Sequence, residues 1–298
     1  MQAKANLLRT LLVLPVVVLV AVAVALFGLG LRTAETQEPQ AADTQTTTTS
    51  IQVQDLGTLG DTEGTQSKAF GINDSGQVVG YSHRNDGYDH AFLYDGTMHD
   101  LGVLGGGTSF AYDINNSGQV VGVSTPANGS SYSYYHAFIY DSTNGMKDLN
   151  DLVPADSGLT GWLDKAQAIN NDGKLVVQAT WSGVLLTPAT TATTATYEVQ
   201  YFGTLGNDYG YVFPTDINDA GQAVGTEAWN FNEGGSATDW NGFLYDESAT
   251  PKMQDLGRYS SPQRINDSGK VVGNGFLYDS ATQQRQNLGF YAMGINWA

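Results

Sequence analysis

Histidine side chains are the first candidates for chemistry in this chain, because its 298 residues include four histidines and no cysteine. Two of them, His90 and His136, open the same phrase, which reads HAFLYD in one copy and HAFIYD in the other. No further ligand recurs beside them, and equivalent positions in adjacent repeats are expected to lie well apart. The pattern favours a hydrogen-bonding role at a strand edge over metal binding, and the isolated His83 and His99 receive no role. The sequence therefore predicts no metal ligand and no cofactor.

Carboxylates are the second candidates, since a glycoside hydrolase needs two of them roughly 5–10 Å apart in one pocket. Most aspartates recur at equivalent turn positions, as Asp95 and Asp141 do. The chain has no GxSxG elbow, HExxH motif or phosphate-binding loop, so we predict no catalytic residue and a protein that is not an enzyme. The carboxylates that break the repeat, which nothing in the sequence pairs, are Asp164, Glu227, Glu233 and Asp239.

Recurring Asn-Asp-Ser-Gly phrases suggest calcium binding, because calcium prefers carboxylate and carbonyl oxygens. They lack the alternating DxDxDG spacing and the downstream glutamate of a calcium loop. We therefore interpret these phrases as tight turns.

Aromatic residues in irregular loops are the more informative functional signal. In a four-stranded meander, the loops between strands two and three and the loops between repeats emerge at one edge. Polar loops that carry aromatic rings suit stacking on sugars or protein binding, so we expect a ligand-binding face there. The alternative is that the rings only hold long loops against the strand ends. The candidate ligand-binding residues are Tyr88, Tyr132, Tyr134, Tyr135, Trp162, Tyr209, Tyr211, Trp229, Phe231 and Trp240.

The elements that must position these residues are internal repeats. The phrase AFGINDSGQVVG, which starts at Ala69, returns four times with small changes, and a truncated AMGINWA closes the chain. A second phrase of the HAFLYD type follows each complete copy, so five full repeats are present. The isoleucines that mark the copies are Ile72, Ile114, Ile169, Ile217, Ile265 and Ile295.

Each repeat is predicted to contain two hairpins and hence four strands. AFGI and QVVGYS flank an Asn-Asp-Ser-Gly turn, whose glycine can adopt the positive φ that closes it. In the fifth repeat Asn274-Gly275 joins the second and third strands directly. Both strand faces are apolar, so each sheet needs a neighbour on either side. The expected fold is all-β, a β-propeller of four-stranded antiparallel blades, with five blades favoured and six as an alternative.

Two further features of the architecture remain open. Residues 51–57 and 292–298 are leftover strands that would latch a ring or begin a sixth blade. A stacked solenoid or open array is the second architecture, although 42–55 residues with two hairpins is long for one solenoid coil.

The phrases DLGTLG, AFGINDSGQVVGYS and HAFLYDG resemble the HAF-repeat family of extracellular repeat proteins. The resemblance covers roughly residues 51–298, and the complete His-Ala-Phe triplet occurs only at His90 and His136. It implies export and repetition but supplies no reaction.

A charged and then apolar segment precedes the repeats. Residues 1–10 contain Lys4 and Arg9 and are expected to stay in the cytoplasm. Residues 11–31 carry no charge, and a helix of that length would span about 30 Å of hydrocarbon. An uncleaved signal anchor and a cleaved signal peptide both remain open. Residues 32–50 are expected to form a disordered threonine-rich linker, and residues 51–298 form the repeat domain.

The charge of the chain limits its partners. Its net charge is −17, and no basic patch exists to neutralise phosphates, which argues against nucleic acid. We therefore expect a non-enzymatic extracytoplasmic binding or scaffold module, held at the cell membrane or secreted, with a carbohydrate or cell-envelope protein as its ligand. The alternatives are a purely structural cell-envelope repeat protein and a propeller-type glycoside hydrolase.

Overall fold

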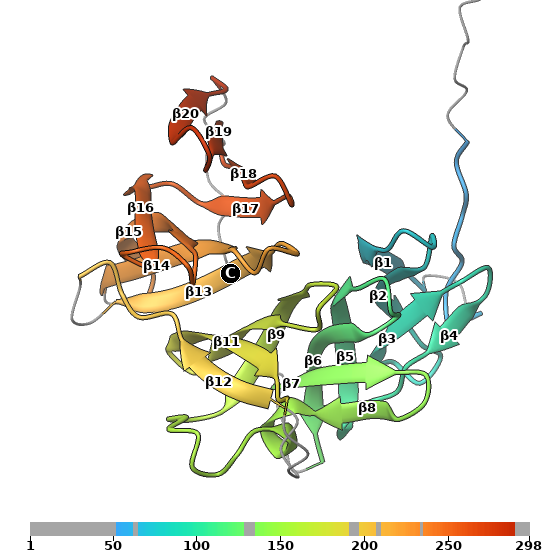
Figure 1. Cartoon of the computed structure of the whole chain (residues 1–298). Coiled ribbons are helices and arrows are strands. Elements are labelled where there is room, and N and C mark those ends of the chain that lie inside the picture. The colour runs from blue at the N-terminus through green and yellow to red at the C-terminus, as the bar shows by residue number, and fades with distance from the viewer. Residues whose placement is uncertain are drawn as a thin grey trace, which may run out of the picture. The chain divides into compact units, whose positions relative to one another are not determined.

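The computed structural model describes residues 52–61, 65–127, 135–190, 197–206, 210–232 and 235–289. The repeats lie in a compact unit that begins at Gln54. Within the described ranges the chain forms five four-stranded sheets and one short 3-10 helix, so the all-β prediction is confirmed (Figure 1). In every sheet the strands follow one another in sequence order and pair antiparallel, as the two-hairpin repeat predicts.

The five sheets are numbered here by repeat. Sheets 1 and 2 consist of β1 (Ser67–Ile72), β2 (Val78–His83), β3 (Asp89–Tyr94), β4 (Met98–Asp100), then β5 (Gly105–Ile114), β6 (Val120–Pro126), β7 (His136–Asp141), β8 (Gly145–Asp148), with η1 (Leu149–Leu152) following. Sheet 3 consists of β9 (Leu163–Ile169), β10 (Leu175–Ala179), β11 (Ser182–Pro188) and β12 (Tyr197–Tyr201). Sheets 4 and 5 consist of β13 (Tyr211–Ile217), β14 (Ala223–Phe231), β15 (Ala237–Tyr245), β16 (Met253–Arg258), then β17 (Pro262–Ile265), β18 (Lys270–Gly273), β19 (Phe276–Asp279), β20 (Gln284–Asn287).

The turn between the first two strands is closed by its asparagine. Asn73 Oδ1 accepts hydrogen bonds from the amides of Ser75 and Gln77, at 3.1 and 3.0 Å. Gly76 completes the turn with a φ of 77°, which glycine adopts without a Cβ penalty. The same capping bond recurs in the other four repeats, from the amides of Gln119, Lys174, Gln222 and Lys270. The tight-turn interpretation of this phrase is confirmed.

The same asparagines also join one sheet to the next. Asn73 Nδ2 donates to the carbonyl of Asn115 at 3.0 Å, and Asn115 Nδ2 donates to the carbonyl of Asn170 at 3.1 Å. Asn170 continues the series to Asn218 at 3.1 Å, and Asn218 continues it to Asn266 at 3.0 Å. We call this series the asparagine ladder. It fixes the register of all five repeats at the turn edge of the sheets.

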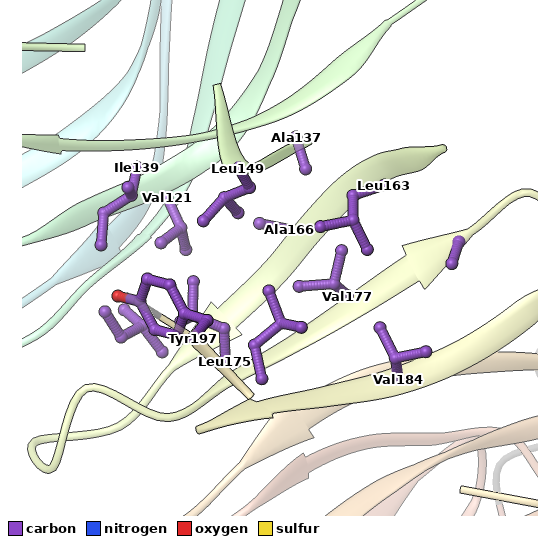
Figure 2. Packing of buried hydrophobic residues seen from close by; sticks show 13 residues of the cluster. Val121, Ala137, Ile139, Leu149, Leu163, Ala166, Leu175, Val177, Val184 and Tyr197 are labelled. Atoms are coloured by element: carbon purple, nitrogen blue, oxygen red, sulfur yellow. The ribbon is translucent and has the colours of Figure 1, made fainter. Parts of the chain in front are cut away.

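Apolar side chains fill the interfaces between consecutive sheets. Between sheets 1 and 2, Val79 of β2 packs with Ile114 and Val120. The interface between sheets 2 and 3 repeats this arrangement with Val121 and Leu175 (Figure 2). Burying a side chain of this size contributes about 1.5–3 kcal/mol, so these interfaces are the main stabilising contacts between repeats.

The first strand of each sheet makes the contacts with the sheet before it. β5 contacts β1, β2 and β3, and β9 contacts β5, β6 and β7. β13 contacts β9, β10 and β11 in the same way, and β17 contacts β13 and β14. The first strand of each repeat therefore makes most of the contacts with the preceding sheet, and second-strand residues such as Val120 and Leu175 add to the apolar interface.

The N-terminal predictions fall outside the described residues. The apolar segment 11–31 and the linker 32–50 lie outside the described residues, and so do residues 290–298 at the other end of the sequence. Where the structure describes the chain, it contains no helix long and apolar enough to cross a membrane.

Candidate functional site

Three aromatic rings form a continuous strip across the interface of sheets 3 and 4. The ring centroids of Trp181 and Tyr211 lie 5.0 Å apart, and those of Tyr211 and Phe231 lie 4.8 Å apart. Trp181 is 61% exposed and Phe231 is 39% exposed. Large rings at this exposure do not serve a packed core, so the strip is the best candidate for a ligand-binding surface. We call these three residues the aromatic strip.

Local structure places each ring at the loop edge of the sheets. Trp181 lies in the two-residue turn between β10 and β11, where Ala179 pairs with Ser182. Tyr211 opens β13, and Phe231 is the last residue of β14, which extends further than the second strands of sheets 1, 2, 3 and 5. The lengthened hairpin brings Phe231 beside Tyr211.

A second aromatic pair lies on sheet 4. The ring centroids of Trp240 and Tyr259 are 5.0 Å apart, and Tyr259 is exposed. Asp239 accepts hydrogen bonds from Asn230 Nδ2, Arg258 Nη2 and the Tyr259 hydroxyl. These bonds lower the pKa of Asp239 to about 2, the bond from Asn230 contributing most. Asp239 is thus a fixed anion that orders this loop, which is not the state a general acid requires.

The repeat histidines form hydrogen bonds between the third and fourth strands. His90 Nδ1 lies 2.8 Å from Asp100 Oδ1, and His136 Nδ1 lies 2.5 Å from Asp148 Oδ2. In sheet 4 Asn241 takes the same position and donates to Asp255, at 2.9 Å. The predicted hydrogen-bonding role is confirmed. Asparagine can replace the histidine because only a donor is needed.

Trp162 forms a third aromatic contact, on sheets 2 and 3. Its indole is stacked on the His136 ring with centroids 5.2 Å apart and an interplanar angle of 18°. Trp162 is 50% exposed. Nearby, burial raises the pKa of Asp164, and a hydrogen bond from the Thr180 amide opposes that shift.

The remaining predicted aromatic residues are dispersed. Tyr88 is exposed, but its ring lies over Gly107, where a Cβ would come within 2.6 Å of it. Tyr135 packs edge-on against Phe110 at 6.1 Å, and Trp229 is half-buried. Tyr132, Tyr134 and Tyr209 lie outside the described residues. The structure thus brings Tyr211 and Phe231 together and separates the others into local contacts.

Sequence reasoning missed Trp181 and Tyr259, although both occupy the loop classes that it selected. Trp181 lies in a two-residue loop, and Tyr259 lies in a short link between repeats. The selection favoured long irregular loops. Asking which rings lie next to a strand end at the loop edge, in short loops as well as long ones, would have found both.

Glu227, which breaks the repeat, has a structural role. It is fully buried, and its Oε2 accepts a hydrogen bond from the Leu205 amide at 2.9 Å. Ser82 and Ser124 make the same bond in sheets 1 and 2, to the amides of Leu59 and Leu104. Glu227 therefore holds the link into its own sheet, as the serines do. Glu233 lies outside the described residues.

Two carboxylates that the sequence reasoning missed occupy equivalent positions on the first strands of sheets 2 and 4, where each accepts a hydrogen bond from a main-chain amide of another sheet. Asp113 Oδ2 accepts from the Ile169 amide at 2.9 Å, and Asp216 Oδ2 accepts from the Ile265 amide at 2.8 Å. Burial raises the pKa of Asp113. Burial also raises the pKa of Asp216 to about 6, with a further contribution from the charge of Asp113 and opposition from Arg264.

A comparison of the repeats would have revealed this pair. The residue before the marker isoleucine varies among the repeats, and two repeats place an aspartate there. In order along the chain, this position holds Gly71, Asp113, Ala168, Asp216 and Arg264.

Metal binding finds no support in the described part of the chain, which contains no group of three histidine or carboxylate residues placed to hold an ion. The site chemistry within these ranges is that of exposed rings and of carboxylates that accept main-chain hydrogen bonds.

Fold and site together define an all-β repeat protein in which consecutive sheets pack through their first strands and aromatic rings line the loop edge. Residues 29–182, more than half of the chain, match the family model described as "Protein of unknown function (DUF3466)", and the chain belongs to this family. No curated protein matches the chain.

Proposed function

We propose that this protein is a non-enzymatic binding module that uses the aromatic strip to hold a carbohydrate. The observation that carries the proposal is the contact of Trp181, Tyr211 and Phe231 across two sheets with two of the rings well exposed. Flat, exposed rings stack on the apolar faces of sugars, and each ring loses little conformational entropy because it is already packed against its neighbour.

The setting of the strip supports a carbohydrate over a nucleic acid. The chain carries 30 acidic and 13 basic residues, so its field repels phosphate chains. A cell-envelope protein remains the alternative ligand, because rings of this kind also form hot spots in protein interfaces. A purely structural role in the cell envelope is the alternative without any ligand.

The cellular location of the protein and the arrangement of its sheets are part of the same proposal. We infer that the sheets are the blades of a β-propeller, of five or six blades, and that the repeats are of the HAF type. We also infer that the protein works outside the cytoplasm, tethered through residues 11–31 or secreted after cleavage. The charged and then apolar leader supports export, and the repeated interfaces between sheets support a ring.

A second candidate function rests on Asp113 and Asp216. A glycoside hydrolase needs two carboxylates with unlike pKa values in one site, and these two interact electrostatically. Both carboxylates already accept main-chain amides, which favours a structural role. Release of reducing ends from a bound glycan, abolished in Asp216→Asn, would favour the hydrolase instead.

The experiment is a glycan array followed by calorimetry on the full-length chain and on a Trp181→Ala/Tyr211→Ala/Phe231→Ala variant. We expect the variant to lose at least tenfold in affinity, because stacked rings are the contacts that truncation removes. Tyr88→Ala is the matched control, since this ring is exposed but outside the strip. Undiminished binding by the triple variant would overturn the proposal, and binding to envelope proteins alone would replace the carbohydrate.

A further inference from the structure

Sheet 5 carries an interior-type face that no described strand covers. Val272 of β18 is 41% exposed, whereas its four equivalents in the earlier sheets are 0% exposed. Those equivalents pack against the marker isoleucine of the following sheet, as Val224 packs with Ile265. The equivalents of Val272 are Val79, Val121, Val176 and Val224. Sheet 5 therefore presents the surface onto which a further first strand packs.

The asparagine ladder stops at the same place. Asn266 Oδ1 accepts from the Lys270 amide at 2.9 Å, so its side chain is oriented as in the other repeats. In those repeats the side-chain amide donates to the next sheet, as Asn218 Nδ2 donates to the Asn266 carbonyl. Among the described residues, Asn266 Nδ2 has no such acceptor. The exposed valine and the last donor of the ladder mark the same missing neighbour.

The chain itself contains a segment of the matching sequence. Residues 292–296 read AMGIN, and residues 69–73 read AFGIN. The described residues end at Gly289, directly after β20, and this segment begins three residues later. A single strand covers most of such a face, because the first strand of each sheet makes most of the contacts with the sheet before it.

We propose that residues 292–296 dock on sheet 5 as a sixth first strand. Ile295 covers Val272, and the carbonyl of Asn296 accepts the hydrogen bond from Asn266 Nδ2. The link of four residues between Asn287 and Ala292 spans up to roughly 17 Å when extended, and packed sheets lie about 10 Å apart. This docking depends on the repeat and not on the ligand of the aromatic strip.

Cysteine pairs in the full-length chain test the docking, because the chain has no cysteine of its own. We expect Val272→Cys/Ile295→Cys to form a disulfide within one chain on mild oxidation. The matched control is Val224→Cys/Ile265→Cys, which reports the preceding interface and sets the expected yield. Peptide mass spectrometry of the non-reduced digest identifies the linked residues.

Other occupants of the face give different results, and each would overturn the proposal. A disulfide between chains would show that a second copy covers Val272. An intrachain disulfide in Val272→Cys/Ile72→Cys, without one to position 295, would show that sheet 1 covers it. A control pair that links while Val272→Cys/Ile295→Cys does not would show that the segment lies elsewhere.

A stability measurement provides a second readout. Ile295→Asp should lower the Tm by roughly 5 °C or more, because it places a charge in an apolar interface. Val53→Asp is the matched control, since Val53 is 93% exposed and should leave the Tm within about 2 °C. An unchanged Tm in Ile295→Asp would also overturn the docking.

Discussion

The two edges of the sheets differ in how strictly they repeat. At the turn edge the asparagine ladder passes through all five repeats with side-chain bonds of 3.0–3.1 Å. At the loop edge the serine that holds the link between repeats is replaced by Glu227 in sheet 4, and the aromatic strip and the Trp240–Tyr259 pair lie on sheets 3 and 4. The regular edge keeps the repeats in register, and that frees the loops of the other edge to vary. We therefore look for stability at the turn edge and for ligand binding at the loop edge.

The largest loss of stability is expected at the middle of the asparagine ladder. Asn170 is 3% exposed, accepts from the Lys174 amide and donates to the Asn218 carbonyl. Asn170→Ala leaves both partners unsatisfied and should lower the free energy of unfolding by about 4 kcal/mol. Urea unfolding followed by fluorescence measures the loss.

The matched control for the ladder is Asn144→Ala, in the exposed turn between β7 and β8. Asn144 bonds only to Asp141 at the surface, so its loss should cost less than about 1 kcal/mol. Equal losses in the two variants would contradict a special role for the ladder.

The second effect concerns Asp216, on the first strand between the two edges. Its pKa in the folded protein is about 6, above the usual 3.8, so the folded state binds the proton more tightly than the unfolded state. This contribution to stability is present at low pH and is lost as the pH rises from about 4 through about 6. Asp216→Asn stays neutral and can still accept from the Ile265 amide, so it should be more stable than the parent at pH 8 by up to about 3 kcal/mol.

Urea unfolding at pH 4, 5, 6 and 8 checks the sign of this effect. The difference between Asp216→Asn and the parent should shrink as the pH falls below about 5. A variant that is less stable than the parent at pH 8 would show that the carboxylate is favourable when charged. The Asp216 carboxylate would then stabilise the folded protein, as the asparagine ladder does.

The fold could be predicted from the sequence because the same pattern of turn and strand residues occurs in all five repeats. Asn73 and Gly76 close a turn in each copy, and the isoleucine beside them marks the strand that faces the preceding sheet. The inter-sheet bonds of the ladder could not be predicted, because a sequence does not show which turns become neighbours.

The candidate site was predicted only in part, for a related reason. Tyr211 and Phe231 were selected from their loops, but their contact with Trp181 joins residues from two repeats. The pairing of Asp113 with Asp216 has the same character, since two intervening interfaces bring them within electrostatic range. Local patterns specify elements, whereas sites depend on how the elements pack.

The smallest effect on stability is expected at the aromatic strip. This measurement tests directly whether the loop edge differs from the turn edge in having little role in stability. Trp181 is 61% exposed and lies in a turn, so Trp181→Ala should change the free energy of unfolding by less than about 1 kcal/mol. Urea unfolding measures the stability of this variant and of Phe243→Ala, which removes a fully buried ring. Phe243→Ala should lose about 3–5 kcal/mol, as buried rings do. If Trp181→Ala lost as much, the ring would serve to hold sheets 3 and 4 together, and the loop edge would be structural like the turn edge.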